Sequence, residues 1–323
     1  MNSAHLPVGM VLVGVTVGFL SLRYFSRPKS GAFRLWGWAG LVLLALFGTL
    51  LVFRVGWVST FFTPLCWTSY LLLADAAVCS LKGSSRLSES PREFLLLALV
   101  SIPLWLIFEA YNLRMQNWTY VGLPANPVLR NFGYAWSFAT IWPAIFETAD
   151  LLQALGLFGR PIRPHAPFSR TCRTTLVVVG ALFLAAPALV PVGIGQYLFA
   201  PVWVGFALLL DPVNYAWGGH SLLRDREEGD ASLFWNLMAA GLVCGVFWEF
   251  WNYWAAARWL YVFPILQGWK IFEMPLPGFL GFPAFAVECF VMFESVKVLA
   301  RGLCQTRRGG QVSQPYTSAA ESE

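Results

Sequence analysis

The chain has 323 residues, of which 57% are hydrophobic and only 12% are charged, and its mean hydropathy is +0.60. Soluble domains carry about 25% charged residues, so this composition excludes an ordinary water-soluble fold. The formal net charge of +5 is concentrated in a few connecting segments and indicates membrane topology; no nucleic-acid partner is expected.

Apolar runs follow one another along the chain, and each approaches the ~20 residues that a membrane-spanning helix requires. The sequence therefore predicts an all-α polytopic membrane bundle that packs in a lipid bilayer. About nine transmembrane helices are expected, at residues 6–22, 35–53, 62–81, 94–112, 134–157, 174–196, 199–219, 233–256 and 277–299.

Lys and Arg residues gather in alternate connections. Of the 22 such residues, 17 lie in the segments 23–34, 82–92, 160–173, 224–226 and 297–308. Because cytoplasmic segments are enriched in Lys and Arg, the N-terminus is predicted outside and the C-terminus in the cytoplasm. We expect a multi-pass protein of a bacterial cytoplasmic membrane.

One pattern occurs twice along the chain. The stretch from Trp67 to Asp75 matches the stretch from Trp203 to Asp211 without a gap, and further matches follow. Four polar positions recur: Asp75 and Asp211, Glu109 and Glu249, Asn112 and Asn252, and Glu147 and Glu288. An ionisable residue inside a membrane is costly, so each recurring acid is a candidate functional residue.

The matches define a parallel duplication of four plus four spans, preceded by one helix. The expected segments are an N-terminal helix with a basic inner loop (1–34), repeat 1 (35–158), a basic inner linker (159–173), repeat 2 (174–300) and a disordered tail (301–323). Parallel repeats are usually related by an axis along the membrane normal, and sites form where the two halves meet.

Eight acids fall inside the predicted spans, which contain one basic residue, Lys297. Ion pairing is therefore not expected to neutralise these acids, and burial favours the neutral carboxylic acid. In each repeat a Glu and an Asn lie three positions apart on one helix face, so the Asn amide is expected to orient the carboxyl. We assign Asn112 and Asn252, together with Asp75 and Asp211, as supporting residues.

Two connections on the outer side, residues 113–132 and 257–275, each contain a Trp-x-Tyr pattern. Such segments either lie among the lipid headgroups or fold as a lid over a cavity. The candidate pocket walls are Trp118, Tyr120, Trp259 and Tyr261.

Acids and aromatic rings together indicate a chemistry. A neutral carboxyl in an aromatic pocket can protonate an isoprenoid double bond and shield the carbocation from water. The candidate catalytic residues are Glu109, Glu249, Glu147 and Glu288. Three scattered His residues and six unpaired Cys residues give no metal-binding spacing, and we expect neither a metal nor a cofactor.

The order of these motifs resembles the lycopene cyclase domain of membrane carotenoid cyclases. Trp259 and Tyr261 precede the segment from Pro283 to Phe290, and Trp118 and Tyr120 precede the segment from Pro143 to Glu147. Each copy has a single Glu where that family has Pro-x-Glu-Glu. A carotenoid hydratase family is also similar. The resemblance implies a duplicated helical unit in carotenoid biosynthesis, an isomerase or lyase that cyclises or hydrates an isoprenoid lipid.

Two other functions remain open. Duplicated halves with acids near the membrane centre also suit a proton-coupled carrier of a small solute. Acids can also join helices by hydrogen bonds in a scaffold without activity. A polar, water-accessible path would favour the carrier, whereas an enclosed apolar pocket would favour the enzyme. The sequence indicates no particular protein partner.

Overall fold

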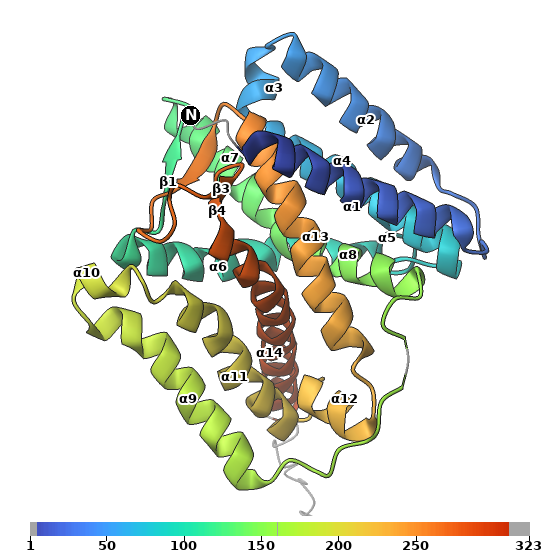
Figure 1. Ribbon diagram of the computed structural model, residues 1–323. Coiled ribbons are helices and arrows are strands. Elements are labelled where there is room, and N and C mark those ends of the chain that lie inside the picture. Colours follow the sequence, from blue (N-terminus) through green and yellow to red (C-terminus); the bar gives the residue numbers. More distant parts are fainter. Residues whose placement is uncertain (1–4, 160, 310–323) are drawn as a thin grey trace, which may run out of the picture.

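The computed structural model describes residues 5–159 and 161–309 and is mostly helical (Figure 1). Within these residues, eight helices are long and apolar enough to cross a membrane. The expected all-α polytopic bundle is confirmed.

The first half of the chain forms α1 (Leu6–Ser26), α2 (Leu35–Val52), α3 (Gly56–Thr60), α4 (Phe62–Lys82), α5 (Arg86–Glu89), α6 (Pro91–Met115), β1 (Trp118–Val121), α7 (Pro127–Ala139) and α8 (Ile141–Ala154). The second half forms α9 (Arg170–Leu189), α10 (Val192–Gly195), α11 (Phe199–Ala216), α12 (Leu222–Glu228), α13 (Ser232–Trp254), β2 (Arg258–Tyr261), β3 (Lys270–Ile271), β4 (Met274–Pro275), the 3-10 helix η2 (Leu276–Leu280) and α14 (Gly281–Gly309).

The predicted fifth span, residues 134–157, is not one helix. Two shorter helices, α7 and α8, meet there at Thr140. Pro143 accounts for the break, because proline has no N–H and its ring clashes with the carbonyl four residues earlier in a continuous helix. With 14 residues, α8 is about 21 Å long and shorter than the apolar thickness of a bilayer.

Two helix pairs form the ends of the molecule. Helix α2 packs on α4, and α9 packs on α11 at the opposite end (Figure 1). Glycine permits both close contacts. A Cβ atom on Gly40 would lie 2.4 Å from the Ser69 carbonyl oxygen, and one on Gly180 would lie 2.7 Å from that of Gly205. Because Ser69 and Gly205 are equivalent positions, both repeats pack a glycine of one helix against the same backbone carbonyl position of the next.

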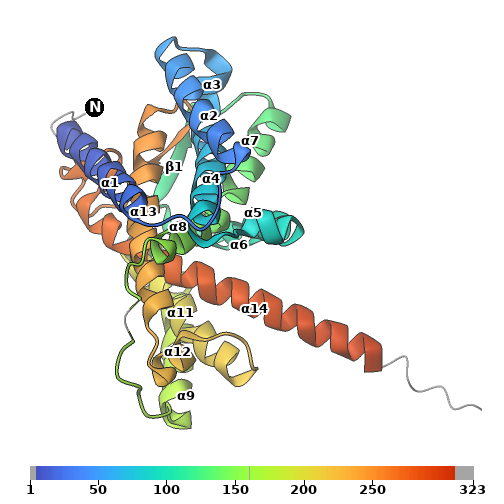
Figure 2. The ribbon, with the colours of Figure 1, turned by 90° about the vertical axis from the view of Figure 1, so that its right-hand side faces the viewer.

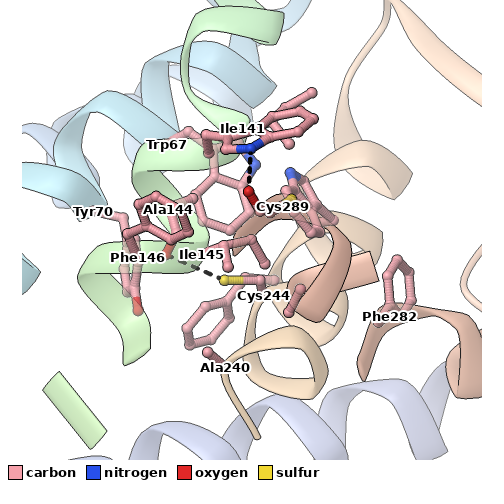
Figure 3. Close-up of a cluster of buried hydrophobic side chains, with 14 of the residues drawn as sticks. Trp67, Tyr70, Ile141, Ala144, Ile145, Phe146, Ala240, Cys244, Phe282 and Cys289 are labelled. Carbon is pink, nitrogen blue, oxygen red and sulfur yellow. Dashed lines mark hydrogen bonds between the residues drawn. The ribbon is translucent and has the colours of Figure 1, made fainter. Parts of the chain in front are cut away.

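The core lies where α4, α8, α13 and α14 meet (Figure 3). Trp67, Ile145, Cys244 and Phe282 come from these four helices and are buried. The indole of Trp142 donates a 2.8 Å hydrogen bond to the carbonyl of Cys289, which joins α8 to α14. The repeats are therefore packed into one body around aromatic side chains.

The two connections that contain the Trp-x-Tyr patterns join each other. Strand β1 pairs antiparallel with β2, with Trp118 opposite Tyr261 and Tyr120 opposite Trp259. Since Trp118 is equivalent to Trp259 and Tyr120 to Tyr261, the pair has the register of a two-fold axis. Gly122 adopts a φ of 67°, and a Cβ atom there would lie 2.0 Å from the Ala256 carbonyl oxygen. The connections thus form one paired lid.

Helix α14 ends the described chain. Its C-terminal half extends beyond the other helices (Figure 2) and continues to Gly309, so the start of the expected disordered tail is helical. The remainder of that predicted tail, residues 310–323, lies outside the described residues.

Candidate functional site

An aromatic cavity of about 140 Å³ lies between the two repeats under the β1–β2 lid. Equivalent residues from both repeats line it, and these pairs are Trp67 and Trp203, Phe108 and Trp248, Trp118 and Trp259, Tyr120 and Tyr261, and Ile141 and Phe282. All four predicted pocket walls are among them. The cavity is therefore shared between the repeats.

Glu109 is connected to this cavity through its hydrogen bonds. Its Oε1 atom accepts from the hydroxyl of Tyr120 at 2.5 Å, the indole of Trp105 at 2.8 Å and the indole of Trp118 at 3.3 Å. All three donor side chains line the cavity, whereas Glu109 lies behind them. Burial, with the adjacent Glu109 carboxyl, raises the pKa of Tyr120 well above its usual value. The phenol therefore stays protonated at neutral pH.

Glu249 occupies the equivalent position with fewer donors. Its side chain is fully buried, and its Oε1 atom accepts from the hydroxyl of Tyr261 at 3.0 Å. The indole of Trp259 donates to that hydroxyl at 2.9 Å. The other oxygen of Glu249, Oε2, has no partner within the described part of the chain. Burial and the Glu249 carboxyl raise the pKa of Tyr261 well above its usual value.

The two Asn residues do not orient the acids, which corrects the sequence-based expectation. Asn112 donates to the Trp118 carbonyl at 2.9 Å and accepts from the backbone N–H groups of Asn117 and Trp118. Asn252 donates to the Trp259 carbonyl and accepts from the Trp259 N–H, both at 2.9 Å. Each Asn therefore fastens a strand to the end of the preceding helix, and the Tyr of that strand holds the acid.

Glu147 and Glu288 are fully buried but do not line the cavity. Neither oxygen of Glu147 has a hydrogen-bond partner within the described residues. The carboxyl lies close enough to Tyr70 to interact with it electrostatically. Glu288 accepts from the Phe206 N–H at 3.3 Å. Tyr70 and Phe206 are equivalent positions on α4 and α11. Glu147 thus lies near α4 and Glu288 lies near α11. If either acid is catalytic, as the sequence predicts, it must act at a site other than this cavity.

Asp75 and Asp211 fasten the loops that follow their helices. Asp75 accepts from the Ser85 hydroxyl at 2.8 Å and the Leu87 N–H at 2.9 Å. Asp211 makes the same contacts 10 to 12 residues later, with Ser221, Leu222 and Leu223. Carboxylates in this position satisfy the free N–H groups at a helix start. Their recurrence reflects a shared structural role at α5 and α12.

Two of the intramembrane acids are ion-paired, contrary to the expectation that pairing could not neutralise them. Asp150 accepts from Arg86 at 2.7 Å, and Glu294 pairs with Lys297 on the same helix. Arg86 belongs to a connection in the sequence, but folding places its side chain against α8. A count of charges within spans therefore missed this partner.

Two arginines line the cavity. Arg258, in β2, pairs with Glu273 at 3.7 Å, and Arg130 lies on α7. Burial raises the pKa of Glu273, while Arg258 and Lys270 oppose that shift. Both belong to the five Lys and Arg residues that lie outside the basic connections of the sequence.

Sequence reasoning also missed several aromatic walls. Trp67 and Trp203 begin an ungapped repeated stretch, so the duplication itself contained a signal for them. Trp105 has no such signal, because its equivalent is Gly245. A Cβ atom on Gly245 would lie 2.2 Å from the Phe282 ring, which occupies that space in repeat 2.

Within the described residues, no group of three or more His, Cys, Asp or Glu side chains is arranged to hold a metal ion. Comparisons with models of protein families, with curated proteins and with solved structures find no match.

Proposed function

We propose that the protein is a membrane enzyme that protonates a carbon–carbon double bond of an isoprenoid lipid, with Glu249 and Tyr261 as the proton-donating pair. The supporting observation is a tyrosine of the cavity wall that is hydrogen-bonded to a fully buried carboxyl with one unpartnered oxygen. A carboxyl with few donors is poorly stabilised as an anion, so burial favours its protonated form.

The proposed reaction needs only the groups at the cavity. The Tyr261 hydroxyl gives a proton to the double bond, forming a C–H bond and a carbocation, and Glu249 returns a proton to the phenol oxygen. Attack by a second double bond closes a ring. Loss of a proton from the ring cation to the Tyr261 oxygen, which passes its own proton on to the Glu249 carboxylate, restores the acid, so the net reaction is an isomerisation. Capture of the cation by water, with loss of the same proton, gives hydration instead.

The cavity walls suit a carbocation. Aromatic faces attract cations, and six tryptophans line this space: Trp67, Trp105, Trp118, Trp203, Trp248 and Trp259. A dry apolar cavity of about 150 Å³ accommodates a benzene-sized molecule. The cavity here, at about 140 Å³, therefore suits one ring-sized end group of a longer chain. A carotenoid would place only its end group inside.

Glu109 is assigned a different part. Its Oε1 atom accepts three hydrogen bonds, which favour the carboxylate and partly offset the cost of burying its charge. A carboxylate behind Tyr120 favours positive charge in the cavity, so Glu109 would stabilise the cation while Glu249 supplies the proton. The two repeats would thus contribute unequal halves of one site.

The resemblance to the lycopene cyclase domain supports the proposed chemistry through the Trp-x-Tyr elements, which the structure places at the cavity. The lining also favours an apolar ligand over the small polar solute of a carrier. We further infer that the N-terminus lies outside a bacterial cytoplasmic membrane and the C-terminus inside, because basic residues gather in the inner connections. The lid would then lie on the outer side.

The decisive experiment uses the full chain in lipid nanodiscs with linear terpenes and polyenes in deuterated water. Protonation of a double bond would leave one deuterium in the product, detectable by mass spectrometry. We expect Glu249→Gln to lower product formation by about 100-fold or more, because general acids contribute at least that factor. Tyr261→Phe should also lower it.

The matched control is Glu89→Gln, which alters an exposed acid on α5 far from the lid. It should retain the parent activity. Unchanged product formation in Glu249→Gln, in protein with the parent melting temperature, would falsify the proposed mechanism.

A further inference from the structure

The charged side chains that line the cavity are two arginines, with no acid among the lining residues. Arg258 has an anionic partner in Glu273. Arg130 is half-buried, and the described residues provide its guanidinium with neither a hydrogen bond nor an ion pair. A cation held at the edge of an apolar cavity without a counter-ion is complementary to an anion carried on an apolar chain.

Aromatic rings connect this cation to Glu109. Tyr134 lies one helical turn after Arg130 on α7 and contacts the Tyr120 ring edge-on, with centroids 5.2 Å apart. The Tyr120 hydroxyl donates to Glu109. Arg130 and Tyr134 both line the cavity. A ligand with its charged end at Arg130 would therefore extend its chain along these rings towards the centre of the site.

We propose that the ligand of this cavity is an isoprenoid chain that ends in a phosphate group, with the phosphate bound by Arg130 and the adjoining isoprene units in the aromatic cavity. Arginine matches phosphate geometry because its planar guanidinium donates two parallel hydrogen bonds. The isoprenoid nature of the chain rests on the proposed function; the anionic end group rests on Arg130 alone.

Arginines near the membrane surface commonly contact the headgroups of surrounding lipids. Arg130 differs from such residues because it lines the cavity. Arg54 lies on the same predicted side, after α2, and its side chain is exposed and outside the cavity. It is the natural control. If phosphate binding is a property of the cavity, then substitution of Arg130 should affect it and substitution of Arg54 should not.

The experiment measures binding of geranyl phosphate and of geraniol, the same chain without the charge, to the full chain in phosphatidylcholine nanodiscs. Quenching of the cavity tryptophans reports binding. We expect the parent to bind geranyl phosphate about 10-fold more tightly than geraniol, as one charge-assisted contact provides. Arg130→Gln should abolish that preference, Arg130→Lys should retain part of it, and Arg54→Gln should leave it intact.

Equal affinity of the parent for the two ligands would overturn the proposal. Equal losses in Arg130→Gln and Arg54→Gln would also overturn it, because they would indicate attraction by surface charge. So would a preference that disappears in nanodiscs rich in phosphatidylglycerol, since bulk headgroups would then occupy Arg130. Melting temperatures without ligand identify any variant that fails to fold, and Arg130→Lys then provides the test.

Binding and turnover separate this inference from the proposed function. Glu249→Gln should keep the preference for geranyl phosphate while losing product formation. A parent that shows the preference but forms no product from any isoprenoid would retain the phosphate site and overturn the chemistry. Product formation from neutral terpenes, without any preference for geranyl phosphate over geraniol, would support the chemistry and overturn the phosphate site.

Discussion

Glu109 and Glu249 occupy equivalent positions but have different neighbours four residues earlier in their helices. Trp105 donates to Glu109, whereas Gly245 leaves room for the Phe282 ring beside Glu249. One substitution between the repeats therefore changes the hydrogen-bond donors around the acid. In the proposed mechanism, this difference distinguishes the group that stabilises a cation from the group that releases a proton.

The Asn residues provide a prediction at this scale. Asn252→Ala removes the two hydrogen bonds that fasten the start of β2, and it leaves the Trp259 N–H and carbonyl without their partner. Loss of one partner of a buried hydrogen bond costs about 1–3 kcal/mol. We expect Asn252→Ala to lower the free energy of unfolding by about 2 kcal/mol, measured by denaturant titration in detergent.

Glu249, on the same helix as Asn252, is expected to respond differently to substitution. Glu249→Gln keeps the shape of the side chain and a group that can bond Tyr261, so it should change stability much less than Asn252→Ala does. A larger loss of stability in Glu249→Gln than in Asn252→Ala would contradict the division into a fastening residue and a functional residue.

At the scale of elements, some features follow from local sequence and others depend on pairing. The long helices follow from apolar runs, and the repeat predicted which positions share an environment. Recurrence alone could not distinguish structural from functional acids. Asp75 and Asp211 recur because each holds the start of a short helix, and Glu109 and Glu249 recur because each accepts a hydrogen bond from a cavity tyrosine. The contact of Glu109 with Tyr120 could not be predicted, since it depends on how β1 returns over its own helix.

Glycine packing is testable on one helix. Gly40→Ala would place a Cβ atom against the Ser69 carbonyl oxygen on α4, whereas Gly48, two turns later on α2, has no atom within 4 Å of the added Cβ. Overpacking costs about 1–3 kcal/mol, and alanine in an open helix position is favourable. Thermal unfolding should show a lower melting temperature for Gly40→Ala and an unchanged or higher one for Gly48→Ala. Equal effects would mean that α2 does not pack this closely.

The lid can be tested by cross-linking. Thr119 and Leu260 are directly opposite in the β1–β2 pair, and Cβ atoms of such pairs lie about 4.5–5.5 Å apart. Thr119→Cys with Leu260→Cys should form a disulfide under mild oxidation, detected by mass spectrometry of peptides. Thr119→Cys with Val262→Cys, displaced by two positions in the register, should cross-link far less. Similar yields from both pairs would contradict the observed register.

For the whole molecule, the proposed orientation rests on the distribution of charge along the sequence and can be tested by labelling. Val128→Cys, on the predicted outer side, should react with an impermeant maleimide in intact cells, whereas Arg92→Cys should react only after permeabilisation. Both positions are exposed to solvent or headgroups. Labelling above that of the parent cysteines is the measure, and the opposite pattern would reverse the proposed orientation.

The two-fold register of the β1–β2 pair also has a consequence for how such a molecule can arise. A contact between equivalent surfaces is the kind that two identical subunits make in a closed dimer. Because Trp118 faces Tyr261 and Tyr120 faces Trp259, two copies of a single repeat would form the same strand pair and enclose the same cavity. In a homodimer, any substitution near the acid occurs in both subunits. In the fused chain, the residues around Glu109 and those around Glu249 can change independently.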